Sequence, residues 1–292
     1  MRAVASASSS WSRGRVTPED RARYHADGFV VLRGFVDPER CDALRARAAE
    51  LVRAFEPGGR RSIFTTDEQA RKTDDYFLDS GDQIRFFFEE DAVGADGLLL
   101  RAQERSINKI GHALHDLDPT FDAFSRTAAL EALVGELGAL EPRLVQSMYI
   151  FKQPFVGGEV RVHQDATFLH TEPESLLGLW FALEDARRDN GCLWGIPGGH
   201  RAGLKSRFVR EGRSTRFETL DGSPWDEAAL VPLEAAKGDL IVLGGLAPHL
   251  SRANRSPASR HAYTLHVVPA ASAYPATNWL RRATPARGFR QG

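Results

Sequence analysis

The sequence predicts a mainly β domain with flanking helices, a β-sandwich or jelly roll. Helical patterns dominate up to about residue 141, whereas short candidate strands follow one another between about residues 142 and 270. Clusters of Gly, Pro, Asn and Asp separate these strands, which is typical of sandwiches and jelly rolls. Because 292 residues carry no strong linker or repeat, we expect one domain over residues 17–292, preceded by a disordered tail at residues 1–16.

Two helices and a strand are predicted in the first 55 residues. Thr17 and Pro18, followed by two acidic residues, are typical of a helix start, and Gly28 ends that helix. Apolar residues 29–32 predict a strand. Asp37-Pro38 then begins a second helix, in which apolar residues recur at helical spacing: Leu44, Ala48, Leu51, Val52 and Phe55.

The spacing of apolar residues is less regular between residues 56 and 140. Residues 56–82 are rich in loop-forming residues, and a short alternating piece follows around residues 84–88. Two further helices are predicted between residues 98 and 140, with a break at Asp118-Pro119. This interpretation places Lys109 in a helix, where a lysine is usually solvated.

Beyond Pro142, apolar residues alternate with other residues in short runs that predict strands. The runs cover residues 144–151, 160–164, 177–182, 192–196, 240–243 and 261–268. The polar, Arg-rich segments at residues 56–82 and 201–225 remain as loops, and we expect them to face a substrate.

Composition excludes several classes of function. Lys and Arg number 38 against 39 Asp and Glu, so the net charge of −1 provides no basic field for a nucleic acid. Two cysteines, Cys41 and Cys192, are too few for a disulfide framework or a Cys-based zinc site. No apolar run is long enough for a membrane span. We expect a cytoplasmic enzyme, although the basic residues 1–15 leave an organellar transit peptide as an alternative.

His163 and Asp165 form a candidate metal-binding pair. In a strand, residues i and i+2 project to the same face, so the imidazole and the carboxylate approach a common point. His249, just beyond a predicted strand, returns to this point when a jelly roll closes, and completes the two-His, one-carboxylate set typical of non-haem iron. A His-x-acid pair occurs by chance about once in such a chain, and His25-Ala-Asp27 is a second example.

Longer stretches resemble the phytanoyl-CoA dioxygenase family, in particular its branch of phytanoyl-CoA dioxygenase domain-containing proteins. They are SINKIGHALH at 106–115, MYIFKQP at 148–154, HQDATFL at 163–169, TEP at 171–173, GLW at 178–180, ED at 184–185, NGCLW at 190–194, PGGH at 197–200, and residues 249–260. The resemblance runs from about residue 18 to residue 280. PGGH departs from the family's PGSH, and residues 172–178 are about one residue shorter than in relatives.

The resemblance implies a cupin-like double-stranded β-helix that holds Fe(II) on His163, Asp165 and His249. It also implies that Arg260 and Ser251 bind the distal carboxylate of the cosubstrate 2-oxoglutarate, in a pocket lined by Lys109, Met148, Gln164 and Trp180. The implied reaction uses O2 to hydroxylate an aliphatic C–H bond, with release of succinate and CO2. Because Asp165 is retained and related halogenases lack this carboxylate, hydroxylation is favoured over halogenation.

The residues alone leave two other functions as alternatives. The same ligands serve zinc hydrolases, although no His-Glu-x-x-His motif is present. A jelly-roll binding protein without catalysis is the second alternative. We expect a small-molecule substrate, and the family's range leaves an acyl-CoA thioester, a small osmolyte and a secondary metabolite as candidates.

Overall fold

The computed structural model describes residues 16–57, 62–63, 74–94, 96 and 98–289. The expected tail lies outside these residues except for Val16, which is buried and donates its backbone N–H to the Glu136 carboxylate at 3.2 Å. No helix in the described part of the chain has the length and apolar character needed to cross a membrane.

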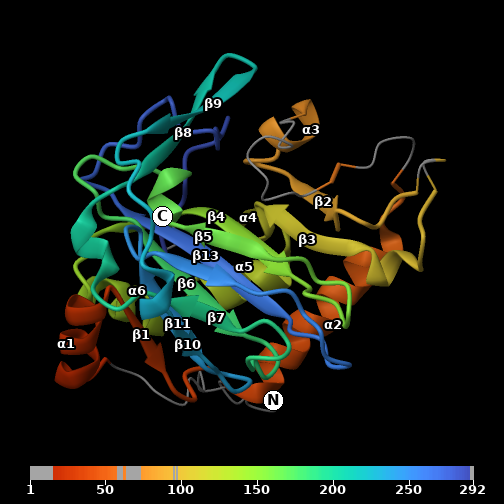
Figure 1. Ribbon diagram of the computed structural model, residues 1–292, viewed down its shortest axis with the longest axis horizontal. Helices are drawn as coiled ribbons and strands as arrows, with labels where there is room; N and C mark the ends of the chain where they lie inside the picture. Colours follow the sequence, from red (N-terminus) through yellow and green to blue (C-terminus); the bar gives the residue numbers. More distant parts are fainter. Residues whose placement is uncertain (1–15, 58–61, 64–73, 95, 97, 290–292) are drawn as a thin grey trace, which may run out of the picture.

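Within the described ranges, six α-helices precede or interleave with the first strands (Figure 1). Their bounds are α1 Pro18–Asp27, α2 Pro38–Ala54, α3 Asp75–Leu78, α4 Leu114–Leu117, α5 Pro119–Ser125 and α6 Ala128–Glu136. The predicted start of α1 is confirmed: Thr17 and Asp20 form a reciprocal capping box. Gly28 ends the helix with a left-handed φ of 84°, a conformation that glycine adopts without strain.

In the described part of the chain, thirteen strands form three antiparallel sheets. The strands are β1 Phe29–Leu32, β2 Ile84–Phe88, β3 Ile107–His112, β4 Pro142–Ile150, β5 Val160–His163, β6 Leu177–Ala182, β7 Leu193–Gly195, β8 Ser206–Glu211, β9 Ser214–Thr219, β10 Val231–Leu233, β11 Leu240–Gly244, β12 His249–Ser251 and β13 Ala262–Pro269. The large sheet has the order β1-β11-β6-β13-β4-β3-β2, the small sheet β10-β7-β12-β5, and β8 pairs with β9.

Two predictions about these segments are wrong. Residues 107–112, which include Lys109, form strand β3 rather than part of a helix. Residues 206–219, expected as loop, form the hairpin β8–β9, which projects near α3 at the top of Figure 1. The guanidinium of Arg210 in this hairpin donates to the Leu78 carbonyl at the end of α3, at 2.6 Å.

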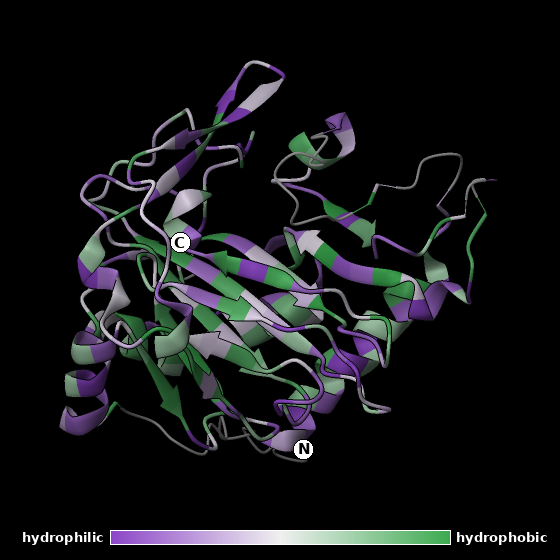
Figure 2. Ribbon diagram, viewed as in Figure 1, coloured by the Kyte–Doolittle hydropathy of each residue, from purple (hydrophilic) through white to green (hydrophobic). Residues whose placement is uncertain are grey.

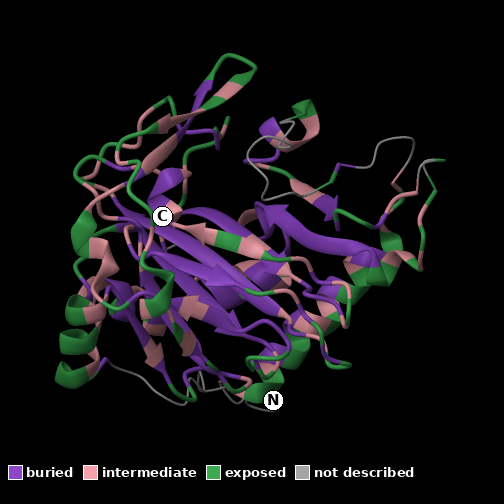
Figure 3. Cartoon of the chain, viewed as in Figure 1, coloured by how far each residue is buried: buried purple, intermediate pink, exposed green. Residues whose placement is uncertain are grey.

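The large sheet is buried on both faces, and alternation along its strands assigns each residue to one of two cores. On β6, Leu179 and Phe181 pack toward the helices, whereas Trp180 and Ala182 face the small sheet. Figure 3 shows these central strands buried, with exposed residues gathered on the outer helices and the hairpin tip. Figure 2 shows the same strands as largely hydrophobic and α1, at the edge of the molecule, as mostly hydrophilic. The face of the large sheet that Trp180 shares is turned toward the small sheet, and the two sheets enclose a cavity there that polar side chains line.

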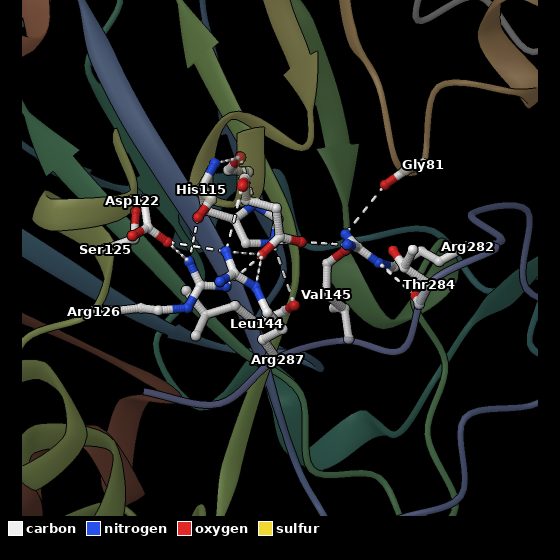
Figure 4. Close-up of polar contacts among 12 residues, drawn as sticks. Gly81, His115, Asp122, Ser125, Arg126, Leu144, Val145, Arg282, Thr284 and Arg287 are labelled. Atoms are coloured by element: carbon white, nitrogen blue, oxygen red, sulfur yellow. Dashed lines mark hydrogen bonds and ion pairs between the residues drawn. The ribbon is translucent and has the colours of Figure 1, made fainter. Parts of the chain in front are cut away.

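A buried ionic cluster anchors the chain that follows β13 (Figure 4). Asp116 at the end of α4 is 8% exposed and pairs with Arg126, Arg282 and Arg287. Arg282 also donates to the Gly81 and Val145 carbonyls at 3.2 and 3.3 Å. Because Trp279 precedes Arg282 by three residues and lines the cavity, this cluster fixes one wall of it.

We expect Asp116→Asn to lower the free energy of unfolding by about 3 kcal/mol, because it leaves the buried guanidinium of Arg282 without its counter-charge, whereas Arg126 and Arg287 keep their pairs with Asp122. Urea unfolding followed by circular dichroism measures this change. The matched control is Asp91→Asn, which breaks the exposed pair with Arg101 and is expected to cost less than about 1 kcal/mol. Equal unfolding midpoints for the two variants would contradict the anchoring role.

Candidate active site

Pairing between β5 and β12 brings two histidines together at the edge of the small sheet. His163, the last residue of β5, lies directly opposite His249, the first residue of β12, and their ring centroids are 4.3 Å apart. Gln164 remains extended, and Asp165 then begins a short 3-10 turn, η2 Asp165–Thr167. The strand thus ends one residue earlier than predicted, yet the alternation from His163 to Asp165 is kept.

The three side chains form a group that fits a metal ion. One ligand atom from each of His163, Asp165 and His249 lies within 4.8 Å of the others. Asp165 Oδ1 is 3.7 Å from His163 Nε2 and 3.8 Å from His249 Nε2. His25 and Asp27, the other His-x-acid pair, lie at the end of α1 and do not belong to this group.

Backbone carbonyls fix the tautomer of both histidines. His163 Nδ1 is 2.9 Å from the Arg161 carbonyl, and His249 Nδ1 is 2.9 Å from the Ala247 carbonyl. A carbonyl oxygen only accepts, so each Nδ1 carries a hydrogen and donates it. Each Nε2 is therefore left with a lone pair directed at the common point, the state that a metal ligand needs.

Asp165 is held from behind by a third histidine. His266 on β13 places Nε2 3.3 Å from Asp165 Oδ2, the oxygen that faces away from the other two imidazoles. Burial by itself raises the pKa of Asp165, but the neighbouring His249, His266 and His163 outweigh it and hold the carboxyl in its charged form. Gly178 leaves space for this contact, because a Cβ there would lie 2.9 Å from Asp165 Oδ2.

Arg260 provides a buried cation in the same cavity. Its Nε donates to the Gly191 carbonyl at 3.0 Å, and Nη2 donates to Ser251 Oγ at 3.1 Å, while Nη1 is buried without a partner among the described residues. Burial lowers the pKa of Arg260 to about 10, so it remains a cation at neutral pH. Its guanidinium carbon lies 5.2 Å from the centre of the Trp180 ring.

Lys152 is a second buried cation beside Arg260, and sequence reasoning did not single it out. It is 2% exposed and lines the cavity, and its Nζ contacts the Gly158 and Ser251 carbonyls at 2.5 and 3.5 Å. Burial, assisted by repulsion from Arg260, lowers the pKa of Lys152 to about 7. Its occurrence within the motif MYIFKQP was the available signal.

The cavity between the sheets has a volume of about 160 Å³. The residues predicted to share it and found in its wall are His163, Asp165, His249, Lys109, Met148, Trp180, Ser251 and Arg260. Lys109 is 5% exposed on β3, and its Nζ lies 3.9 Å from Met148 Sδ. Phe77, Phe168 and Trp279 add an aromatic wall, and His112 and His266 add two imidazoles that the motif argument left unassigned.

Gln164 departs from the expected arrangement because it is not part of the cavity wall. Its Nε2 donates to the Gly203 and Leu246 carbonyls, each at 2.8 Å, and its Oε1 accepts the Lys205 backbone N–H at 2.9 Å. These three hydrogen bonds join the turn after β5 to two loops, one that contains Gly203 and Lys205 and one that contains Leu246. The side chain positions the turn that carries His163 and Asp165.

The site belongs to the class found in metal-dependent oxygenases. It combines a jelly roll, a His-x-Asp···His group and a buried arginine in the same cavity. The profile of the family Phytanoyl-CoA dioxygenase (PhyH) matches residues 24–262. Phytanoyl-CoA dioxygenase 1 of Oryza sativa subsp. japonica is 47% identical over 273 residues, covering 93% of this chain and 96% of its own. Phytanoyl-CoA dioxygenase domain-containing protein 1 of Rattus norvegicus is 44% identical over 281 residues, covering 92% and 96%.

Solved structures show the same fold at low sequence identity. The non-heme alpha ketoglutarate dependent carbocyclase SnoK from nogalamycin biosynthesis has a TM-score of 0.64 at 17% identity, covering 95% of this chain and 94% of its own. EctD from S. alaskensis with bound Fe has a TM-score of 0.64 at 19% identity, covering 94% and 86%. The chain belongs to the phytanoyl-CoA dioxygenase family. It is a 2-oxoglutarate-dependent dioxygenase with the facial triad His163, Asp165 and His249.

We expect His163→Ala to weaken metal binding more than about 100-fold, because the loss of a ligand exceeds the 10- to 100-fold cost typical of an outer contact. Calorimetric titration with Mn(II) under anaerobic conditions measures the affinity. His25→Ala is the matched control, since His25 is exposed on α1 and belongs to the other His-x-acid pair. Unchanged Mn(II) affinity in His163→Ala would show that the metal binds elsewhere.

Proposed function

We propose that the protein hydroxylates an aliphatic C–H bond of a small molecule, with Fe(II) held by His163, Asp165 and His249 and 2-oxoglutarate as cosubstrate. The observation that carries this proposal is the cavity itself, with a triad that offers two imidazole lone pairs and a carboxylate, and an arginine with an unpartnered Nη1. A dianionic cosubstrate fits between a metal and a cation.

The bound iron, together with 2-oxoglutarate and O2, supplies the oxidising chemistry, which releases succinate and CO2 and delivers a hydroxyl group to the substrate. The chain's own residues bind and orient. Ser251 accepts from Arg260 and donates to the Gly191 carbonyl at 2.9 Å, so its hydroxyl sets the direction of the guanidinium. Arg260 and Lys152 together favour the distal carboxylate, with Trp180, Met148 and Lys109 lining the space toward the triad.

Asp165 supports hydroxylation over halogenation, because a third protein ligand occupies the position that a halide needs. Neither alternative function has a comparable observation in its favour. The sequence has no His-Glu-x-x-His motif of the kind that zinc hydrolases use. A binding protein without catalysis does not need the tautomers of both histidines to be fixed by backbone carbonyls.

The direct test is release of succinate from 2-oxoglutarate in the presence of Fe(II) and O2, measured without added substrate and with a metabolite library. We expect wild-type turnover to exceed that of the double variant His163→Ala/Asp165→Ala at least about 100-fold, because the variant has lost two ligands. No wild-type turnover above the variant, and no iron bound, would refute the oxygenase proposal.

We expect Arg260→Met to raise the KM for 2-oxoglutarate about 100-fold, because a charge-assisted hydrogen bond to a carboxylate contributes about 1.5–3 kcal/mol. Succinate production as a function of 2-oxoglutarate concentration measures this change. Arg23→Met, which removes an exposed arginine of α1, is the control. A KM that stays within twofold of the wild-type value would place the cosubstrate carboxylate elsewhere.

We also propose a cytoplasmic location. Cys41 and Cys192 are both buried and unpaired in the described part of the chain, which suits a reducing compartment. The basic segment at residues 1–15, the basis of the transit-peptide alternative, lies outside the described residues. Imaging of the chain fused at its C-terminus to a fluorescent protein, with and without residues 1–15, decides between the two.

A further inference from the structure

His112 is a cavity residue that neither the metal nor the cosubstrate uses. It is the last residue of β3, is fully buried, and lies in the cavity wall. Its ring contacts Phe77 and Trp279 edge to face, at centroid distances of 5.8 and 5.1 Å. Its Nε2 is buried and has no hydrogen-bond partner among the residues that the structure describes. A buried polar atom left in this state is costly unless a ligand satisfies it.

Ser80 determines which nitrogen of His112 carries the hydrogen. Ser80 Oγ lies 2.6 Å from the Phe77 carbonyl and 2.7 Å from His112 Nδ1. The carbonyl only accepts, so the single hydroxyl hydrogen is donated to Phe77. His112 Nδ1 must therefore donate to Ser80 Oγ. Burial, and then repulsion from Lys109, lowers the pKa of His112 well below its ordinary value, so the ring is neutral and Nε2 carries a lone pair.

The cosubstrate cannot satisfy this lone pair. The carboxylates and the keto group of 2-oxoglutarate are all hydrogen-bond acceptors, and an acceptor does not pair with His112 Nε2. Ser80 does not line the cavity, and it is hydrogen-bonded to Nδ1 of His112. Because His112 itself lines the cavity, we infer that its Nε2 side faces the cavity. Among the described residues of the cavity wall, His266 Nδ1 is also a buried imidazole nitrogen without a hydrogen-bond partner, but its ring contacts the metal ligand Asp165, so the inference is built on His112 alone.

We propose that His112 Nε2 accepts a hydrogen bond from an O–H or N–H group of the prime substrate, close to the carbon that is oxidised. The substrate class is a small molecule with an alcohol, amine or amide donor on an apolar body. The apolar body packs on Phe77 and Trp279, whose rings stack at 4.2 Å, and on Phe168. A fatty acyl thioester has no donor near its reacting carbons and is disfavoured. This inference rests on the proposed function for the identity of the reaction, but the hydrogen-bond preference is measurable without turnover.

The test uses the full chain loaded with Zn(II) and 2-oxoglutarate, and follows the imidazole nitrogens by NMR, with His112→Phe to assign the signals. The probes are matched pairs of small alcohols and their methyl ethers, such as cyclohexanol and methoxycyclohexane. We expect the Nδ1–H tautomer before addition. We also expect a shift of the His112 Nε2 signal with alcohols only, and dissociation constants about 10-fold lower for alcohols than for ethers. The opposite tautomer, equal effects of both partners, or no response to any alcohol would overturn the proposal.

Ser80→Ala provides the second arm, because it releases the tautomer of His112 without changing the cavity wall. We expect the alcohol-to-ether preference to fall from about 10-fold to near one in Ser80→Ala. Ser125→Ala is the matched control: Ser125 is equally buried but bonds to Tyr263 on the helical side, and the preference should stay near 10-fold. An unchanged preference in Ser80→Ala would contradict the proposal. Absence of iron-dependent succinate release would refute the proposed function alone, because the NMR arms do not use that reaction.

Discussion

The pairing of β5 with β12 is the constraint on which the site depends. It places His163 opposite His249 in a sheet only four strands wide, so the distance between the two imidazoles is set by backbone hydrogen bonds rather than by flexible side chains. Each ring is then fixed by a backbone carbonyl two residues earlier. Gln164 holds the intervening turn from behind, through three contacts with other loops. The ligands of the metal are thereby oriented before any metal arrives.

Charge in the cavity follows from the same architecture. Arg260 and Lys152 lie together and are both almost fully buried, an arrangement that is unfavourable unless an anion joins them. Lys152 responds with a lowered pKa, and the nearby buried Glu89 offsets part of the positive charge. A dianionic cosubstrate that extends from the triad to these cations would neutralise the positive charge that Glu89 does not offset. The aromatic side of the cavity, with Phe77 and Trp279, carries one buried lysine, because Lys109 Nζ lies 6.0 Å from the centre of the Phe77 ring. Its ring surfaces are otherwise suited to an apolar substrate with one donor group.

Much of this arrangement could be predicted from the sequence, and the failures have physical causes. Continuous apolar strands that are buried on both faces, such as β6 and β11, were predicted at their observed positions. Strand β3 was missed because its buried residues include the polar Asn108, Lys109 and His112, so neither a continuous apolar run nor a period-two alternation marks it. Lys109 was assigned to a helix as a result. The hairpin β8–β9 was missed because its strands are largely polar, with few apolar residues to mark an alternation. The resemblance placed Gln164 in the pocket, although strand alternation turns it away from His163 and Asp165. His112 lacked a signal of its own, because Ser80, the residue that fixes its tautomer, is 32 positions away in sequence.

The central claim is that one cavity holds 2-oxoglutarate at two ends, by the metal on the triad and by Arg260. The most direct measurement is anaerobic calorimetric titration of 2-oxoglutarate into the wild-type chain with and without Fe(II). A cosubstrate held at both ends should bind at least about 100-fold more tightly when Fe(II) is present, since one charged contact of about 3 kcal/mol corresponds to that factor. Equal affinity with and without Fe(II) would contradict the claim, because the metal would then take no part in holding the cosubstrate.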